Sequence, residues 1–159
     1  MPYLKAGDVI SGQEGWASML VHDSSGDHVE DLFMVKNLEA TADMEKTDVY
    51  TLGKRGAQHK PNGWSGSGSM TVYYVTSLFR KMVIQYIKTG VPVYFDITVT
   101  NEDPGSSVGL QTVVLKNCSL DSAIIAKLDV ESEVLDEDVD FTFDDVDLLD
   151  SFAAPELGG

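Results

Sequence analysis

The sequence predicts one mainly β domain, an antiparallel β-sandwich or barrel with one flanking α-helix. Three observations support this fold class. Short runs in which β-branched or aromatic residues alternate with polar ones recur along the chain. Only one segment shows convincing helical periodicity. With 159 residues, 43% of them apolar, the chain is long enough to bury one core.

The centre of the chain, residues 69–100, predicts a strand, a helix and a second strand. A helix near 77–89 follows from apolar residues at helical spacing, and Gly90 suits the left-handed residue that ends it. In the second strand we expect Val93, Phe95 and Ile97 to face the helix. The apolar stripe of the helix consists of Leu78, Phe79, Met82, Val83, Tyr86 and Ile87.

The N-terminal part of the chain predicts an arm and then a hairpin. Residues 1–15 contain four Gly or Pro residues and favour an extended N-terminal arm pinned to a neighbouring surface. A strand over residues 16–21, a polar turn over 22–27 and a strand from 29 to 35 form the hairpin. Strict alternation over residues 38–44 favours a further strand over a helix.

Residues 53–68 predict a long loop, because Gly and Ser are frequent there and no period is visible. The segment is basic in an acidic chain, with Lys54, Arg55 and Lys60. A loop of this length is either a mobile surface segment or a contact surface. Trp64 favours the contact surface, because an indole ring is expected to pack against something.

The C-terminal third of the chain predicts more strands and then a loose end. Residues 110–120 and 124–130 predict two strands. A third, around Val139 to Phe143, has one apolar and one acidic face. We expect residues 147–152 to be a short helical or irregular segment and residues 153–159 to be a loose tail. The single domain therefore spans residues 16–152.

The net charge of −15 makes groove-type binding of DNA or RNA improbable, since phosphates need a basic counter-surface. The charge either keeps the protein soluble or makes a surface that repels polyanions. Cys118 is the only cysteine, which excludes an internal disulfide, and we expect it to be a small buried apolar residue. No run is long enough for a transmembrane helix, and the N-terminus does not have the form of a signal peptide.

No motif indicates catalysis or metal binding. The histidines, His22, His28 and His59, lack metal-ligand spacing. The acidic run over residues 136–140 has Phe141 where an EF-hand loop requires glycine. No phosphate-loop lysine follows residues 66–69, and Gly66-Ser67-Gly68 has the wrong flanking residues for a nucleophile elbow. We therefore expect no enzyme activity, no cofactor and no metal.

Several segments, in order along nearly the whole chain, resemble the tail tube protein of PBSX-type prophages. The N-terminal arm and the last few residues match least. The matching segments are residues 51–60 (TLGKRGAQHK), 63–76 (GWSGSGSMTVYYVT), 86–90 (YIKTG), 99–104 (VTNEDP) and 138–145 (DVDFTFDD).

The resemblance implies a fold of the phage tail tube type and a structural subunit of a contractile tail, whether of a phage or of a phage-tail-like bacteriocin. Relatives form hexameric rings that stack into a tube inside a sheath. The implied partners are further copies of the chain and the sheath, tape-measure and baseplate proteins. DNA would be only a repelled passenger, and no stable membrane association is implied. The implied location is the virion or tail-like particle, assembled in the bacterial host cytoplasm.

The resemblance also suggests roles for the unusual segments. We expect ring-to-ring contacts from the arm and the predicted loop, at Leu4, Val9, Ile10, Lys54, Arg55, His59, Lys60 and Trp64. Asp96 and Thr98 point away from the predicted core and are candidates for an acidic lumen that repels DNA. For the acidic strand near Asp140 and Asp144 a position facing the sheath or a neighbour is the alternative, and the sequence does not place this strand. The alternative function is a monomeric acidic β-sandwich that binds a small ligand or carbohydrate, and a hydrolase is a more distant one.

Overall fold

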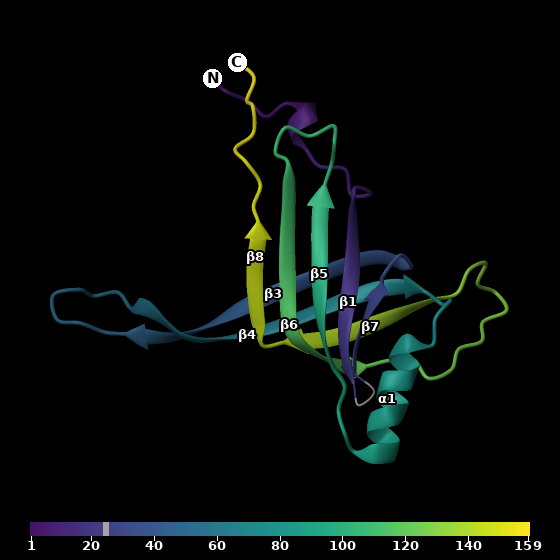
Figure 1. The fold of residues 1–159 in the computed structure, drawn as a ribbon. Coiled ribbons are helices and arrows are strands. Elements are labelled where there is room, and N and C mark those ends of the chain that lie inside the picture. The colour runs from purple at the N-terminus through teal and green to yellow at the C-terminus, as the bar shows by residue number, and fades with distance from the viewer. Residues whose placement is uncertain (24–25) are drawn as a thin grey trace.

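The structure, a computed structural model, describes residues 1–23 and 26–159. Within these residues every named strand pairing is antiparallel and one α-helix flanks the strands, which confirms the predicted fold class (Figure 1). Two residues of the predicted turn, Ser24 and Ser25, lie outside the described residues. The elements are η1 (Ala6–Asp8), β1 (Gly15–Asp23), β2 (Gly26–Asp31), β3 (Val35–Val49), β4 (Gln58–Tyr73), α1 (Leu78–Thr89), β5 (Tyr94–Glu102), β6 (Leu110–Ser122), β7 (Asp136–Phe143) and β8 (Asp145–Asp150).

The strands form two layers that cross each other and share β6. The order along the sheet is β2-β1-β5-β6-β7-β4-β3, and β8 also pairs with β6. We call β2, β1, β5, β8 and the first part of β6 the β1–β5 layer, and β3, β4, β7 and the end of β6 the β3–β4 layer. The transition lies at a β-bulge opposite β5, where Asn117 has a φ of 56°. Because a bulge bends its strand, β6 leaves the upright layer and enters the other (Figure 1).

The core lies between the two layers and α1. Phe95 of β5 meets Phe141 of β7 edge to face, with ring centroids 6.5 Å apart. Phe79 and Met82 extend from α1 into the same cluster. This cluster also contains the residues that were expected to face the helix, Val93, Phe95 and Ile97. The helix itself ends at Gly90, which has a φ of 73°, as the sequence predicts.

The prediction of a loop over residues 53–68 is wrong for most of this range. β3 continues to Val49 and β4 begins at Gln58, so only residues 50–57 connect the two strands. The glycines that suggested flexibility instead make room for aromatic rings of β7. A Cβ on Gly66 would lie 2.5 Å from Cε2 of Phe143. The Gly- and Ser-rich run is therefore a strand whose glycines are packing positions.

Two other predictions near the C-terminus are also wrong. The strand predicted over residues 124–130 is absent from the described structure, where residues 123–135 are irregular. Arg80 donates a hydrogen bond to the carbonyl of Ile124 in this segment, and Lys127 of the segment donates one to the carbonyl of Asp136 at the start of β7. Residues 147–152 were expected to be helical or irregular, but residues 147–150 belong to β8, which pairs with β6, and only residues 151–152 are irregular.

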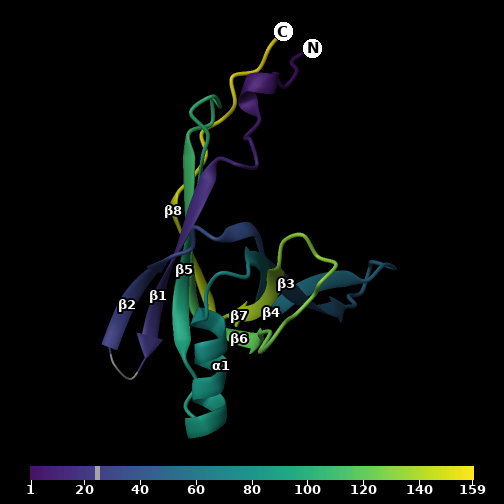
Figure 2. The same cartoon turned by 90° about the vertical axis from the view of Figure 1, so that its right-hand side faces the viewer.

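The two chain ends pair with each other, so the C-terminal tail is not loose as expected. Tyr3 and Gly158 form an antiparallel bridge, and both ends extend from the top of the molecule (Figure 2). The side chain of Asp8, a buried residue, accepts hydrogen bonds from the Lys5 N–H and the Ser107 hydroxyl. Hydrogen bonds to its carboxylate hold the pKa of Asp8 below its usual value. The arm is thus fixed to the turn between β5 and β6.

Candidate functional site

The β3–β4 hairpin projects beyond the rest of the fold (Figure 1). The two strands remain paired as far as Val49 and Gln58. Met44, Tyr50 and Leu52 are exposed toward its end. Large apolar side chains at the end of a projecting element are typical of a surface that another protein covers.

The hairpin brings together most of the contact residues that were predicted within residues 53–68. Lys54 and Arg55 lie in the connection, and His59 and Lys60 begin β4. The ring nitrogen Nδ1 of His59 lies 2.7 Å from a carboxylate oxygen of Asp48 on the facing strand. From residue 45 to residue 62 there are four Lys or Arg and two Asp or Glu. The end of the hairpin is therefore locally basic in an acidic protein.

Trp64 is placed differently from the other predicted contacts. Its ring lies against Phe143, with centroids 6.0 Å apart, while the side chain stays partly exposed. Trp64 therefore marks the base of the hairpin, where the projecting part meets the core.

The arm residues lie on another surface. Leu4 and Val9 are exposed and Ile10 is half-buried. The arm lies near the C-terminus, away from the projecting hairpin (Figure 1). The predicted contact residues therefore form two separate surfaces.

Asp96 and Thr98 lie on the outward face of the β1–β5 layer, opposite the core, as their alternation predicts. Asp96 is only 24% exposed and does not extend freely: its Oδ1 accepts the Asn117 N–H at 2.9 Å. Its other carboxylate oxygen lies 3.3 Å from Nε2 of His22. Carboxylates of Asp27 and Asp96 raise the pKa of His22.

The outward face of the β1–β5 layer is not uniformly polar. Trp16 pairs with Thr100 and Tyr94 with His22, which places both aromatic rings on the outward face. Both rings are exposed, as is Val29 of β2.

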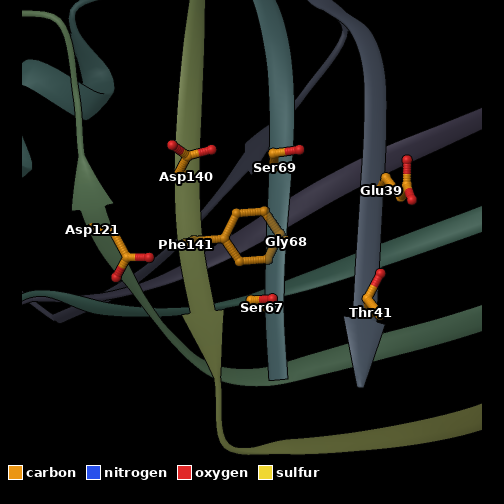
Figure 3. Close-up of a pocket in the computed structure, with 8 residues that line it drawn as sticks. All are labelled: Glu39, Thr41, Ser67, Gly68, Ser69, Asp121, Asp140 and Phe141. Atoms are coloured by element: carbon orange, nitrogen blue, oxygen red, sulfur yellow. The ribbon is translucent and has the colours of Figure 1, made fainter. Parts of the chain in front are cut away.

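A second outward face, which the sequence did not reveal, lies on the β3–β4 layer (Figure 3). A hollow of about 430 Å³ is lined there by carboxylates and hydroxyls from four strands. Ser69 of β4 pairs with Glu39 on one side and with Asp140 on the other. The lining residues are Glu39, Thr41, Ser67, Gly68, Ser69, Asp121, Asp140 and Phe141, with no Lys, Arg or His among them.

The alternation of polar and apolar residues in the sequence could have indicated the part of this face that β7 contributes. The polar residues of β7, including Asp138 and Asp140, alternate visibly in the sequence. Residues 65–71 alternate as well, but in a segment that was assigned to a loop. The two halves come together only through the pairing of β4 with β7. We call this surface, with Ser65, Ser67, Ser69, Thr71, Glu39, Thr41, Asp43, Asp138, Asp140 and Thr142, the hydroxyl–carboxylate face.

One buried ion pair fastens the helix to the β3–β4 layer. Nη1 of Arg80 lies 3.0 Å from Oε2 of Glu137, whose side chain is fully buried. The Arg80 guanidinium also lies 4.4 Å from the centroid of the Tyr74 ring. Burial raises the pKa of Glu137 despite the opposing effect of Arg80. Because the pair is buried and joins α1, β7 and the segment after β6, its evident role is structural.

The part of the chain that the structure describes has no group of three or more His, Cys, Asp or Glu side chains placed to hold a metal ion. Among the same residues, no helix has the length and apolar character needed to span a membrane.

Three sheet edges remain unpaired in the described structure. Within residues 1–23 and 26–159, β2 pairs only with β1, β3 only with β4 and β8 only with β6. Open edges readily pair with another chain. Together with the projecting hairpin, they are typical of a β-structured subunit that assembles with other chains.

Comparisons with known proteins identify the family of this subunit. A family model described as "Phage tail tube protein" matches residues 2–150. The chain therefore belongs to the phage tail tube protein family. It is 39% identical over 145 residues to the phage-like element PBSX protein XkdM of Bacillus subtilis strain 168, covering 91% of this chain and 93% of that protein.

Solved structures of tail-like particles have the same fold. A chain of the 6-fold symmetrised anti-feeding prophage baseplate is similar with a TM-score of 0.64 and 12% identity, over 89% of this chain and 95% of that one. A chain of the sheath–tube complex of an extracellular contractile injection system has a TM-score of 0.60 and 14% identity, over 88% and 90%. These likenesses establish the fold, and the family establishes a tail tube subunit.

Proposed function

We propose that this chain forms the inner tube of a contractile phage tail or tail-like particle as stacked hexameric rings inside a sheath. The free edges of the sheet carry this proposal. β2 and β8 lie at opposite sides of the β1–β5 layer, and each has an unpaired edge within the described residues. Pairing between unlike edges is a head-to-tail contact, which closes into a ring when the rotation is suitable.

The surroundings of the structural relatives support the sheath and the six-fold ring. One relative comes from a complex of sheath and tube, and another from a 6-fold symmetrised baseplate. By analogy the partners are further copies of the chain and the sheath, tape-measure and baseplate proteins, with assembly in the cytoplasm of the bacterial host. The lumen serves DNA passage or membrane puncture, without a catalytic step.

Either of the two outward faces could line the lumen of the tube. We propose that the hydroxyl–carboxylate face does so. This face combines short hydroxyl side chains with carboxylates such as Glu39 and Asp140, and so would repel phosphates without offering an apolar surface to adhere to. The face with Asp96 and Thr98 also exposes aromatic rings, which fits a protein contact better.

Electron microscopy of the purified protein tests the function. The expected result, on raising concentration and salt to screen the charge of −15, is hollow tubes with six-fold symmetry. A monomer under all conditions that also binds a small ligand in a persistent pocket would favour the alternative of a monomeric binding module.

Labelling of assembled tubes tests the lumen. Ser67→Cys and Thr98→Cys variants are compared with a small maleimide and with a maleimide on a carrier too large to enter the tube. The expected result is that Ser67→Cys reacts only with the small reagent. The opposite pattern, with Thr98→Cys protected from the carrier, would assign the lumen to the Asp96 face.

A further inference from the structure

The end of the hairpin has two features typical of a protein-binding surface, which are basic charge and exposed apolar side chains. We define the hairpin tip as residues 44–63. It combines basic side chains, including Lys54 and Arg55, with the exposed apolar side chains of Tyr50 and Leu52. Leu52 is 104% exposed. A partner for this tip must therefore offer carboxylates and apolar side chains together.

The segment between β6 and β7 combines carboxylates with fully exposed apolar side chains. We define the acidic loop as residues 123–135, which connect β6 to β7. It exposes Leu128 and Val130 at 99% and 101%. It also contains Asp129, Glu131 and Glu133 and a single basic residue, Lys127. In the loop, fully exposed branched apolar side chains alternate with carboxylates. The apolar side chains complement Tyr50 and Leu52 of the tip, and the carboxylates complement its basic side chains.

Three other exposed surfaces of the described residues fit the tip less well. β8 also combines carboxylates with apolar side chains, but Val146 and Leu148 are only 41% and 58% exposed, and the edge of β8 is already assigned to pairing within the ring. The exposed apolar side of α1, with Tyr86 and Ile87, lies on a helix that has three Lys or Arg residues and no Asp or Glu. It would repel a basic tip. The hydroxyl–carboxylate face has the charge but lacks exposed apolar side chains along its rows.

The hairpin tip and the acidic loop lie at opposite ends of the molecule. In Figure 1 the hairpin extends to the left, whereas the loop between β6 and β7 extends to the right. Figure 2, seen from the loop's side, places the loop in front of the hairpin strands. Segments at opposite ends of one chain are placed to contact each other between two copies and not within one copy. Such a contact repeats from copy to copy.

We propose that the hairpin tip of one subunit binds the acidic loop of an adjacent subunit, with Tyr50 and Leu52 against Leu128 and Val130. The inference rests on the proposed assembly of the tube and identifies the acceptor surface within it. The contact offsets part of the repulsion between subunits that each carry a net charge of −15. It places the chain's basic segment against an acidic loop, where unlike charges also select the register of docking.

Disulfide cross-linking tests the contact directly. Leu52→Cys protein is mixed with Val130→Cys protein, both retaining buried Cys118, and oxidised during assembly. The expected result is a cross-linked dimer that accumulates as tubes form. The matched control mixes Leu52→Cys with Ile87→Cys, which places the second thiol on the exposed side of α1.

The outcomes separate the contact from the function. Tubes with a Leu52–Val130 cross-link support the contact. Tubes in which Leu52→Cys cross-links only to Ile87→Cys, or to neither, overturn it and leave the tube function intact. No assembly of the unmodified chain under any condition, together with no cross-link, overturns both.

A charge exchange provides a second test. Reversal of the tip (Lys54→Glu, Arg55→Glu, Lys60→Glu) is expected to raise the concentration needed for tubes about tenfold. Reversal of the loop (Asp129→Lys, Glu131→Lys, Glu133→Lys) is expected to do the same, although it makes the chain less negative. Both reversals in one chain should restore assembly. If the loop reversal instead promotes assembly, general repulsion rather than this contact controls it, and the proposal fails.

Discussion

The ring of Phe141 lies against the backbone of Gly68 on the neighbouring strand (Figure 3). A Cβ on Gly68 would overlap the ring atoms of Phe141 and would lie 2.9 Å from the carbonyl oxygen of Glu39. Gly66 and Phe143 repeat this relationship two residues away. The two glycines thus allow the phenyl rings of β7 to pack closely on β4.

Gly68→Ala is expected to lower the free energy of unfolding by about 1–3 kcal/mol, because the added methyl group overpacks the site. Urea unfolding, monitored by circular dichroism, measures the free energy of unfolding of the variant and of the wild type. Gly56→Ala is the matched control, because a Cβ there meets nothing within 4 Å. Equal stability of the two variants would show that the ring moves aside freely.

Arg80→Ala is expected to destabilise the fold by about 3–5 kcal/mol, because it leaves the carboxylate of Glu137 buried without its partner. Thermal or urea unfolding provides the measurement. The neighbouring exposed residue gives the control, since Lys81→Ala removes a cation from the same helix without touching Glu137. A loss as small as that of Lys81→Ala would contradict a structural role for the ion pair.

The raised pKa of Glu137 predicts a specific pH dependence. Between its ordinary value of 4.5 and its higher value in the fold, the folded state binds more protons than the unfolded one. The contribution of Glu137 to stability is therefore present below about pH 4.5 and is lost as pH rises through the folded pKa. Unfolding of the wild type and Glu137→Gln across a pH series measures this difference. Parallel curves for the two proteins would refute the assignment.

Asp8 fixes the arm, so Asp8→Ala is expected to release residues 1–15 while leaving the β layers folded. The reason is the loss of the acceptor for the Lys5 N–H and the Ser107 hydroxyl. Limited proteolysis with mass spectrometry should show faster cleavage within the arm at unchanged far-UV circular dichroism. Glu14→Ala, an exposed change within the same arm, serves as the control. Equal cleavage rates would mean that the other contacts of the arm hold it without the Asp8 carboxylate, among them the bridge between Tyr3 and Gly158 and the hydrogen bond from the Ser11 N–H to Asp103.

Burial raises the pKa of the Cys118 thiol to about 12. We expect almost no reaction of the native protein with a thiol reagent at pH 8 and full reaction in urea. A Leu52→Cys variant is the control for reagent access, and its second thiol should react at once. Rapid labelling of native Cys118 would contradict its buried position in the core.

Local patterns in the sequence were sufficient for the helix and several strands. The helix at Leu78–Thr89 follows from side chains three and four residues apart, and β5 from alternation. The burial of Cys118 and the orientation of Asp96 away from the core also follow from local context. Such features depend on neighbours in sequence, which the sequence contains directly.

The remaining features depend on which distant strands meet. β8 and the glycine-rich strand β4 are strands because β6 and β7 supply their partners and, for Gly66 and Gly68, the rings that fill the space above them. The irregular course of residues 123–135 likewise depends on side chains of Arg80 and Lys127 that bind backbone carbonyls.

The fold class, the helix, the acidic character of the protein and the segments that resemble its family can thus be recognised in the amino-acid sequence. The projecting hairpin formed by the basic segment, and the one face shared by carboxylates and hydroxyls from four strands, become visible only in the folded chain. Periodicity records which side of its own element a residue occupies. Surfaces built across strands depend instead on long-range pairing, which no local pattern encodes.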